Sequence, residues 1–220
     1  MLHAIEEQQF HWHRKYFIIL FCRRLLSQMI FTKIIYACQQ GWKYRKSLRC
    51  FIIDPKLRIN SILEHDPQVW FKEGIKGIIL DFDGVLAAHS EPEPRAEVSI
   101  WLNNLYKNFG PHYIFILSNQ PTEQRNNYFK KYYPGVLFLT GVKGKPYPDG
   151  IFALIKKSGL SPKELLLIDD RLLTGILAAM IAGIQARWVA KPYQDIRFYA
   201  VREKIIQGFR WAERILVSCK

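Results

Sequence analysis

The chain has 220 residues, of which 49% are apolar, and its formal net charge at pH 7 is +13. This length fits one domain with an extension, and the apolar fraction is ample for a single hydrophobic core. The four cysteines, Cys22, Cys38, Cys50 and Cys219, form no CxxC pair. We therefore expect a reducing compartment, with neither a disulfide framework nor a zinc site.

Positive charge is concentrated in residues 1–53, which carry nine Lys or Arg against two Glu. Asp and Glu are absent from Gln8 to Ile53, where basic side chains are interleaved with aromatic and aliphatic ones. Such a basic amphipathic extension suggests contact with an anionic partner, either a membrane surface or a nucleic acid. The alternative is a basic amphipathic helix that packs on the core.

The extension is not expected to span a bilayer. Its longest unbroken apolar run, Tyr16–Cys22, is far shorter than the roughly 20 residues that a span requires, and Arg23 and Arg24 follow it directly. We therefore expect it to lie on a membrane surface. Glu6 and Glu7 argue against a secretory signal peptide, whereas a mitochondrial presequence is compatible with the composition.

Beyond residue 75, short apolar segments alternate with helical patterns, which predicts a mostly parallel five-stranded sheet in an α/β fold. The last helix repeats apolar residues at steps of three and four, and we expect this stripe to face the core: Phe198, Val201, Ile205, Phe209, Ala212 and Leu216. The expected strands are 77–81, 113–117, 136–140, 165–169 and 186–190, and the expected helices are 95–109, 121–132, 148–158, 172–182 and 194–217.

The first of these strands ends in two aspartates one residue apart, Asp81 and Asp83. Open α/β sheets place ligands at the carboxyl ends of their strands. Two carboxylates this close repel each other unless a cation lies between them, and hard oxygen ligands suit Mg²⁺. The pattern favours a nucleophile and an acid/base residue around Mg²⁺, although a polar turn after a strand is a simpler interpretation. His89, eight residues after Asp81, is near enough in the chain to approach the site, but we expect a solvated loop histidine.

Later segments also bring polar side chains to strand ends and loops. Each has a simpler explanation of its own, because such residues also cap helices or carry solvated charge. Those explanations do not account for the order along the chain. The residues are Ser118 and Asn119 after the second strand, Lys143 and Lys145 in a loop, and Asp169 and Asp170 at the end of the fourth strand.

This order of motifs resembles the haloacid dehalogenase-like (HAD) superfamily over roughly residues 60–217. Within it, the chain is most similar to subfamily IIIA and its YqeG-like branch, which is itself similar to the mitochondrial phosphatidylglycerophosphate phosphatases. The similarity rests on residues 74–78, on Lys145-Pro146, on residues 170–174 and on the basic C-terminal helix. The resemblance implies a Rossmann-like three-layer sandwich.

The chain departs from the branch at two motifs. YqeG-like proteins usually read Asp-x-Asp-Asn-Thr at the first motif, where this chain reads Asp-Phe-Asp-Gly-Val. The fourth motif usually reads Gly-Asp-x-x-x-Thr-Asp, but here Asp169 replaces the glycine and Gly175 replaces the final aspartate. We expect the adjacent carboxylates of Asp169 and Asp170 to replace the two aspartates of the usual fourth motif. Position favours Asp170 as the metal ligand, with Asp169 as the second choice.

The resemblance implies phosphoryl transfer through an aspartyl-phosphate. Asp81 would attack phosphorus, because an ionised carboxylate needs no base to activate it. Asp83 would protonate the leaving oxygen and then activate water for the second step. Lys145, with Lys143 as the second candidate, would offset the negative charge around the phosphoryl group.

The same resemblance implies how phosphate and metal are held. Ser118 and backbone N–H groups near Asn119 would bind phosphoryl oxygens. Mg²⁺ would be bound by Asp81, by the backbone carbonyl of Asp83 and by Asp170, with waters and the substrate phosphate completing its shell.

Short spacing between the motifs leaves little room for a large cap domain. Only 37 residues separate Asp81 from Ser118, and 27 separate Ser118 from Lys145. An open site suits a phosphate that protrudes from something large, such as a lipid headgroup, a protein or a nucleic-acid end.

We therefore expect a basic extension over residues 1–53 and a HAD-like phosphatase domain over residues 54–220. The expected activity is Mg²⁺-dependent hydrolysis of phosphatidylglycerophosphate to phosphatidylglycerol. The expected setting is the cytoplasmic face of an anionic membrane (the mitochondrial matrix in a eukaryote), with no specific nucleic-acid partner. Two alternatives remain open: a soluble phosphatase for a small metabolite or a nucleic-acid end, and a catalytically silent binding module of the same fold.

Overall fold

The computed structural model of the protein describes residues 30–89 and 91–219. The chain divides into two units, Met1–Gln39 and Gln40–Lys220. In the first unit, residues 30–39 are helical. Most of the expected N-terminal extension, residues 1–29 with its longest apolar run, lies outside the described residues, and the boundary at residue 53 stays a prediction. None of the helices described has the length and hydropathy of a bilayer-spanning segment.

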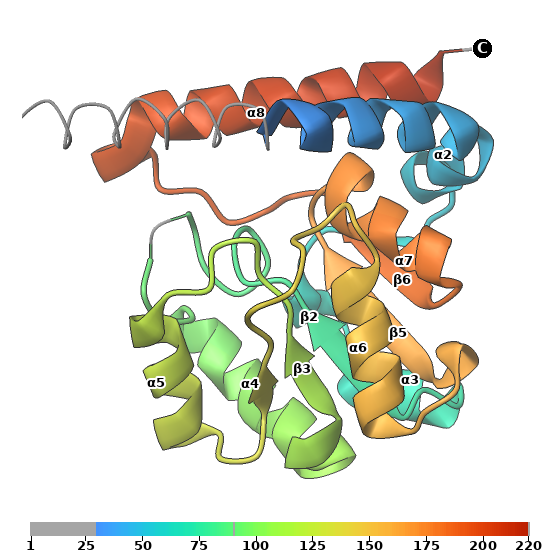
Figure 1. Cartoon of the computed structure of the whole chain (residues 1–220). Helices are drawn as coiled ribbons and strands as arrows, with labels where there is room; N and C mark the ends of the chain where they lie inside the picture. The colour runs from blue at the N-terminus through green and yellow to red at the C-terminus, as the bar shows by residue number, and fades with distance from the viewer. Residues whose placement is uncertain (1–29, 90, 220) are drawn as a thin grey trace, which may run out of the picture. The chain divides into compact units, whose positions relative to one another are not determined.

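A fully parallel sheet of six strands forms the centre of the second unit, in the order β1-β6-β5-β2-β3-β4 (Figure 1). This confirms the Rossmann-like α/β fold class. The expected count of five strands was one too low, because β1 has only two residues and cannot show an alternating pattern. The strands are β1 Arg58–Ile59, β2 Gly77–Leu80, β3 Ile114–Ile116, β4 Leu137–Phe138, β5 Leu165–Asp169 and β6 Gln185–Val189.

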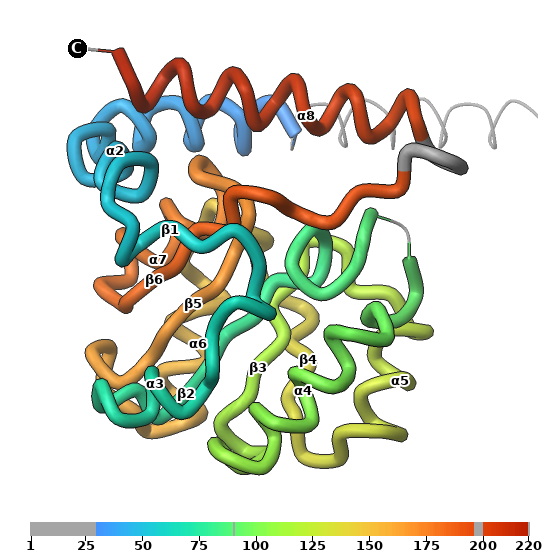
Figure 2. Tube along the Cα trace, turned by 180° about the vertical axis from the view of Figure 1, so that it is seen from behind, coloured from blue at the N-terminus to red at the C-terminus, as the bar shows by residue number. Residues whose placement is uncertain are grey.

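Helices cover both faces of the sheet. Right-handed crossovers place α3, α4 and α5 on one face and α6 and α7 on the other (Figures 1 and 2). The central strands β2 and β5 are therefore buried along their whole length. The helices are α2 Arg45–Ile53, α3 Pro67–Lys72, α4 Ala96–Phe109, α5 Glu123–Tyr132, α6 Asp149–Ser158, α7 Leu177–Ala182 and α8 Ile196–Ser218, with a π-helical turn at Leu172–Ile176.

Local signals explain where several helices begin and end. The side chain of Asp66 accepts a hydrogen bond from the Gln68 N–H, and Pro67 follows it, so α3 starts with a side-chain cap and a proline in its first turn. Thr122 caps α5 in the same way through the Arg125 N–H. Helix α6 ends at Gly159, whose positive φ suits a left-handed cap.

Helix α8 runs across the carboxyl-terminal edge of the sheet, with α2 packed beside it (Figure 1). The expectation that its apolar stripe faces the core was wrong. Val201, Ile205 and Phe209 are 74%, 56% and 52% exposed. The buried positions of this helix include three charged residues instead, because the sheet edge beneath it carries charged partners. These residues are Glu203, Arg210 and Glu213.

Candidate active site

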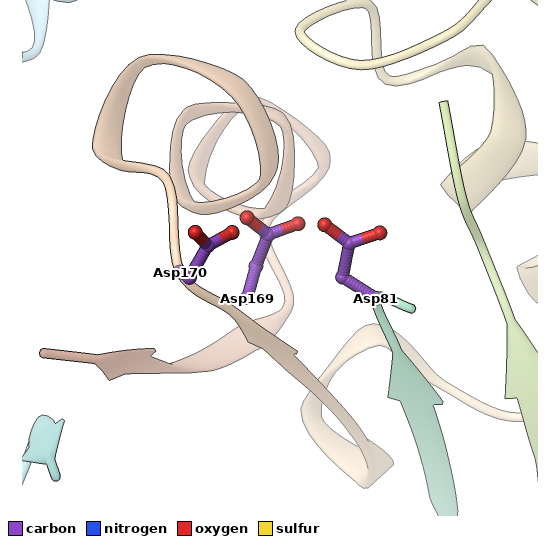
Figure 3. A group of neighbouring side chains, drawn as sticks. All are labelled: Asp81, Asp169 and Asp170. Atoms are coloured by element: carbon purple, nitrogen blue, oxygen red, sulfur yellow. The ribbon is translucent and has the colours of Figure 1, made fainter. Parts of the chain in front are cut away.

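Three buried aspartates meet at the carboxyl ends of the two central strands. Asp81 follows β2 and Asp169 ends β5, and the two strands pair in register, Leu80 opposite Ile168. One carboxylate oxygen from each of Asp81, Asp169 and Asp170 lies within 4.8 Å of the others. Figure 3 shows the three side chains side by side along this edge of the sheet. An all-carboxylate set of this kind could hold a hard metal cation.

Lys145 ties two of these aspartates together. Its Nζ lies 2.8 Å from Asp81 Oδ1 and 2.6 Å from Asp169 Oδ2, and the side chain is almost fully buried. Burial by itself would lower the pKa of Lys145, but the two carboxylates outweigh it and raise the pKa above its ordinary value. The lysine therefore stays charged. Lys143, the second candidate, is exposed and lies over the ring of Tyr147.

The pKa of the Asp81 carboxyl is raised by its surroundings. Burial raises its pKa well above the ordinary value, and the carboxylates of Asp169, Asp170 and Asp83 raise it further, against the opposing effect of Lys145. A divalent cation between the carboxylates would reverse this effect, because a bound metal ion is the largest local charge in such a site. The three-aspartate cluster is thus a place where a cation is electrostatically favoured.

Asp169 and Gly175 fit each other. A Cβ atom added at Gly175 would lie 1.9 Å from Asp169 Oδ2 and 2.6 Å from Asp169 Cβ. Gly175 belongs to the π-helical turn that follows β5. The two departures from the usual fourth motif are therefore linked in space, because the side chain of Asp169 occupies the place that a side chain at position 175 would need.

Asp170 is held from helix α8. Arg210 Nε donates to Asp170 Oδ2 at 2.8 Å, and both residues are buried. Burial raises the pKa of Asp170 to about 6 and Asp169 adds to the rise, although Arg210 and Arg171 oppose it. Asp169 Oδ1 in turn accepts a hydrogen bond from the Arg171 N–H at 2.9 Å. Each metal-ligand candidate thus has a cationic partner, and the choice between them stays a prediction.

Asp83 lies outside the three-aspartate cluster and is gripped by Arg125 of α5. Arg125 Nη1 and Nη2 donate to the two carboxylate oxygens of Asp83 at 3.0 and 2.8 Å. The guanidinium also lies over the ring of Phe82, 3.9 Å from its centroid, and donates to the backbone carbonyl of Glu91. A bidentate pair of this kind fixes the plane and direction of the carboxylate.

Ser118 and Asn119 follow β3 at the same edge of the sheet. Ser118 is buried, and its hydroxyl oxygen accepts a hydrogen bond from the Gln120 N–H at 3.0 Å. Asn119 Nδ2 donates to the backbone carbonyl of Lys145 at 3.1 Å, which joins the loop after β3 to the loop that carries the lysine. The predicted phosphate-binding segment therefore lies beside the lysine.

A pocket of about 560 Å³ opens above these groups. Its floor is polar and one wall comes from α8. The lining residues are Asp81, Asp83, His89, Asn119, Gln120, Asp170, Arg171, Thr174, Val201, Arg202, Ile205, Ile206 and Phe209.

A family model described as mitochondrial PGP phosphatase matches residues 47–194. The chain belongs to this family. It is therefore a HAD-like phosphatase, as the motif order indicated, and the catalytically silent alternative falls away.

Two solved structures are similar at a distance. One is an uncharacterized protein from Listeria monocytogenes serotype 4b, with 20% identity, a TM-score of 0.42, and coverage of 52% of this chain and 78% of that chain. The other is a HAD family hydrolase from Deinococcus radiodurans R1 with bound phosphate and sodium, with 15% identity, a TM-score of 0.35, and coverage of 67% and 99%. Similarity this distant does not inform the chemistry of the site. A comparison with curated proteins gives no match.

Several site residues of this PGP phosphatase family member were not identified from the sequence motifs. Arg125 and Arg210 lie about 40 residues from their aspartate partners, so only the fold brings them together. The expectation for His89 was wrong, because the histidine is buried and lines the pocket. Burial lowers its pKa to about 4, although Asp83 opposes the shift. Its position only eight residues after Asp81 was the sequence feature that could have placed it near the site.

Proposed function

We propose that the protein is an Mg²⁺-dependent phosphomonoesterase that cleaves phosphatidylglycerophosphate to phosphatidylglycerol and phosphate. The family match supports this lipid as the substrate. The observation that carries the proposal is the buried cluster of three carboxylates and one lysine at the carboxyl end of β2 and β5. Carboxylates packed this closely need positive charge, and phosphoryl transfer needs the same positive charge.

Asp81 is the proposed nucleophile. Its Oδ1 accepts the Phe82 N–H at 2.8 Å and lies 2.8 Å from Lys145, which leaves Oδ2 for the attack on phosphorus. In the first step, the bond from Oδ2 to phosphorus forms and the bond to the lipid oxygen breaks. Lys145 offsets the charge that gathers on the phosphoryl oxygens.

Asp83 is the proposed acid and base. It gives a proton to the departing lipid oxygen, and in the second step it takes a proton from the water that attacks phosphorus and releases Asp81. Arg125 aims this carboxylate through two hydrogen bonds. One of those hydrogen bonds must open whenever Asp83 carries the proton, because a protonated oxygen is a poorer acceptor.

Mg²⁺ fits the oxygen donors of Asp81, Asp170 and Asp169. When bound, it would supply positive charge that keeps Asp81 ionised and binds a phosphate oxygen. Asp169 and Asp170 also have cationic partners within the protein, Lys145 and Arg210 respectively.

The basic N-terminal region is the proposed peripheral membrane contact, on the matrix side of a mitochondrial membrane as the family name suggests. Residues 1–53 carry a net charge of +7, and Ile30, Phe31, Ile34 and Trp42 are exposed. Each basic residue near an anionic surface contributes about 1 kcal/mol to binding, and salt screens the attraction.

Co-sedimentation with vesicles tests this contact. The full chain should pellet with anionic vesicles, less so at high salt, and poorly with neutral ones. Equal pelleting with both vesicle types would refute this contact. Deleting all 53 residues is a poor test, since Leu48 and Phe51 are buried.

Phosphate release tests the substrate and the metal together. Phosphatidylglycerophosphate in mixed micelles should be turned over with a higher kcat/KM than its deacylated form or glycerol 3-phosphate. Activity should disappear after exhaustive chelation and return with added Mg²⁺. Preference for the soluble esters would overturn the lipid substrate, and undiminished turnover in chelated protein would overturn the metal.

A further inference from the structure

Helix α8 faces the domain with its charged side. Glu203, Arg210 and Glu213 are 0%, 6% and 5% exposed. Two of them pair with residues that follow β5: Arg210 with Asp170, and Glu213 with Arg171. Ion pairs to the active-site edge therefore help to hold the helix in place, together with the buried side chain of Val217, which is 1% exposed.

Three large apolar residues of α8 are exposed to solvent and are not buried in the core. Val201, Ile205 and Phe209 follow one another at steps of four, so they lie along one side of the helix, and each is more than half exposed. We call these three residues the α8 stripe. Large apolar side chains that are exposed to water contribute little to the stability of the domain. The exposure of the α8 stripe therefore indicates a role in binding.

The α8 stripe begins inside the active-site pocket. All three of its residues line the pocket whose floor holds Asp81 and Asp83. Arg202, beside the stripe, donates to Gln120 Oε1 at 2.9 Å on the opposite side of the same pocket. The pocket thus has a polar end at the aspartates and an apolar wall formed by exposed side chains of α8.

We infer that the α8 stripe binds the hydrocarbon part of an amphiphilic phosphomonoester while its phosphate reaches Asp81. A phosphate ester of a small polar metabolite has no group that would use an apolar wall, whereas a lipid phosphate has both ends. Lys204 and Arg214 are exposed on the same helix and suit the anionic surface from which such a lipid comes. This inference rests on the proposed phosphatase function and adds the part of the enzyme that recognises the tail.

Kinetics on a matched pair of substrates tests the inference. The substrates are phosphatidylglycerophosphate and its deacylated form, which share the phosphate end and differ in the tail. The variant Ile205→Ser/Phe209→Ser should lower the ratio of kcat/KM for the lipid to kcat/KM for the deacylated ester by about ten-fold or more. The control variant Ile100→Ser/Phe152→Ser removes apolar residues that are 73% and 50% exposed on α4 and α6, and should leave that ratio at its wild-type value.

An unchanged ratio in the α8 variant, or an equal fall in the control, would overturn the inference. A second substrate pair, phosphatidic acid and glycerol 3-phosphate, distinguishes failure of the α8 stripe from failure of the proposed substrate. If only the second lipid is hydrolysed and its ratio responds to the α8 variant, the α8 stripe stands and the substrate assignment fails. If phosphatidylglycerophosphate is hydrolysed and neither ratio responds, the substrate stands and the α8 stripe fails.

Chemical labelling tests what covers the α8 stripe in the full chain. Ile205→Cys and, as a control, Ile100→Cys are treated with a maleimide, and the label is read at each position by peptide mass spectrometry. Without lipid, both positions should react at similar rates. Anionic vesicles should slow the reaction at residue 205 and not at residue 100. Slow labelling at residue 205 before lipid is added would mean that another part of the chain or a second copy covers the stripe, and would overturn the inference.

Discussion

A methyl group at position 175 should disable the active-site edge. Gly175→Ala places a Cβ 2.6 Å from Asp169 Cβ and 1.9 Å from its Oδ2. Rotating the Asp169 side chain would move its oxygens but not its Cβ, so the backbone must shift. The backbone at Gly175 is outside the left-handed region, so alanine meets no conformational obstacle of its own.

The magnitude follows from three opposing effects. Alanine is favoured over glycine in a helix by about 1 kcal/mol. Overpacking a buried site costs about 1–3 kcal/mol. Pushing Asp169 away from Lys145, 2.6 Å from it, breaks a buried ion pair at a cost of about 3–5 kcal/mol. The net loss of folding free energy should be roughly 3–7 kcal/mol, a large part of the stability of a typical domain.

A mutant cycle separates this cause from general damage. In an Asp169→Gly background, nothing of residue 169 obstructs the new methyl group, so Gly175→Ala should be neutral or stabilising by up to about 1 kcal/mol. In an Asp169→Ala background, the Cβ remains, so part of the penalty should persist. Urea unfolding of the six proteins, followed by far-ultraviolet circular dichroism, measures these differences. An equal penalty in all three backgrounds would refute the argument.

Two further predictions concern residues that line or support the pocket. Arg125→Lys removes the bidentate hydrogen bond to Asp83, so kcat should fall by roughly 10²-fold with a smaller change in KM. A wild-type kcat would contradict the proposal that Arg125 orients the Asp83 carboxylate. The pKa of His89 is lowered to about 4, so the unfolded chain binds its proton first as pH falls below about 6.5. Between pH 6.5 and pH 4, the free energy of unfolding should therefore fall by up to about 3 kcal/mol more in wild type than in His89→Gln. Urea unfolding at a series of pH values measures this difference. Parallel pH profiles of the two proteins would contradict the lowered pKa.

The positions of the catalytic strands could be predicted from the sequence because they are apolar on both faces. Runs such as Ile78-Ile79-Leu80 are typical of strands buried in a parallel sheet, and the aspartates that end them must then share one edge. Strand β1 could not be predicted, since two residues carry no period.

Helix α8 shows where periodicity misleads. A stripe of apolar residues at helical spacing predicts an inward face, yet Val201, Ile205 and Phe209 are exposed and Glu203 is buried. The surface that α8 covers is the charged edge of the site, so charge complementarity decides which side of the helix is buried. A sequence pattern shows that a helix has two faces, but the neighbouring surface determines which of them is covered.

The supporting residues of the site could not be predicted because their partners are distant in the chain. Nothing near Arg125 or Arg210 marks them as partners of Asp83 and Asp170. Asp169 and Gly175 did stand out, as two separate departures from a motif. The structure adds that one departure makes room for the other.

Asp81 is the proposed nucleophile that attacks the phosphorus of a lipid phosphomonoester. The most direct test is the initial rate of phosphate release from phosphatidylglycerophosphate by Asp81→Asn, measured beside wild type in the same Mg²⁺ buffer. Asparagine keeps the size of the buried side chain, so the variant should stay folded, with an unchanged circular dichroism spectrum. We expect the variant to release phosphate no faster than buffer without enzyme, because an amide cannot replace the carboxylate as nucleophile. A folded Asp81→Asn protein that retains a substantial share of the wild-type rate would contradict it.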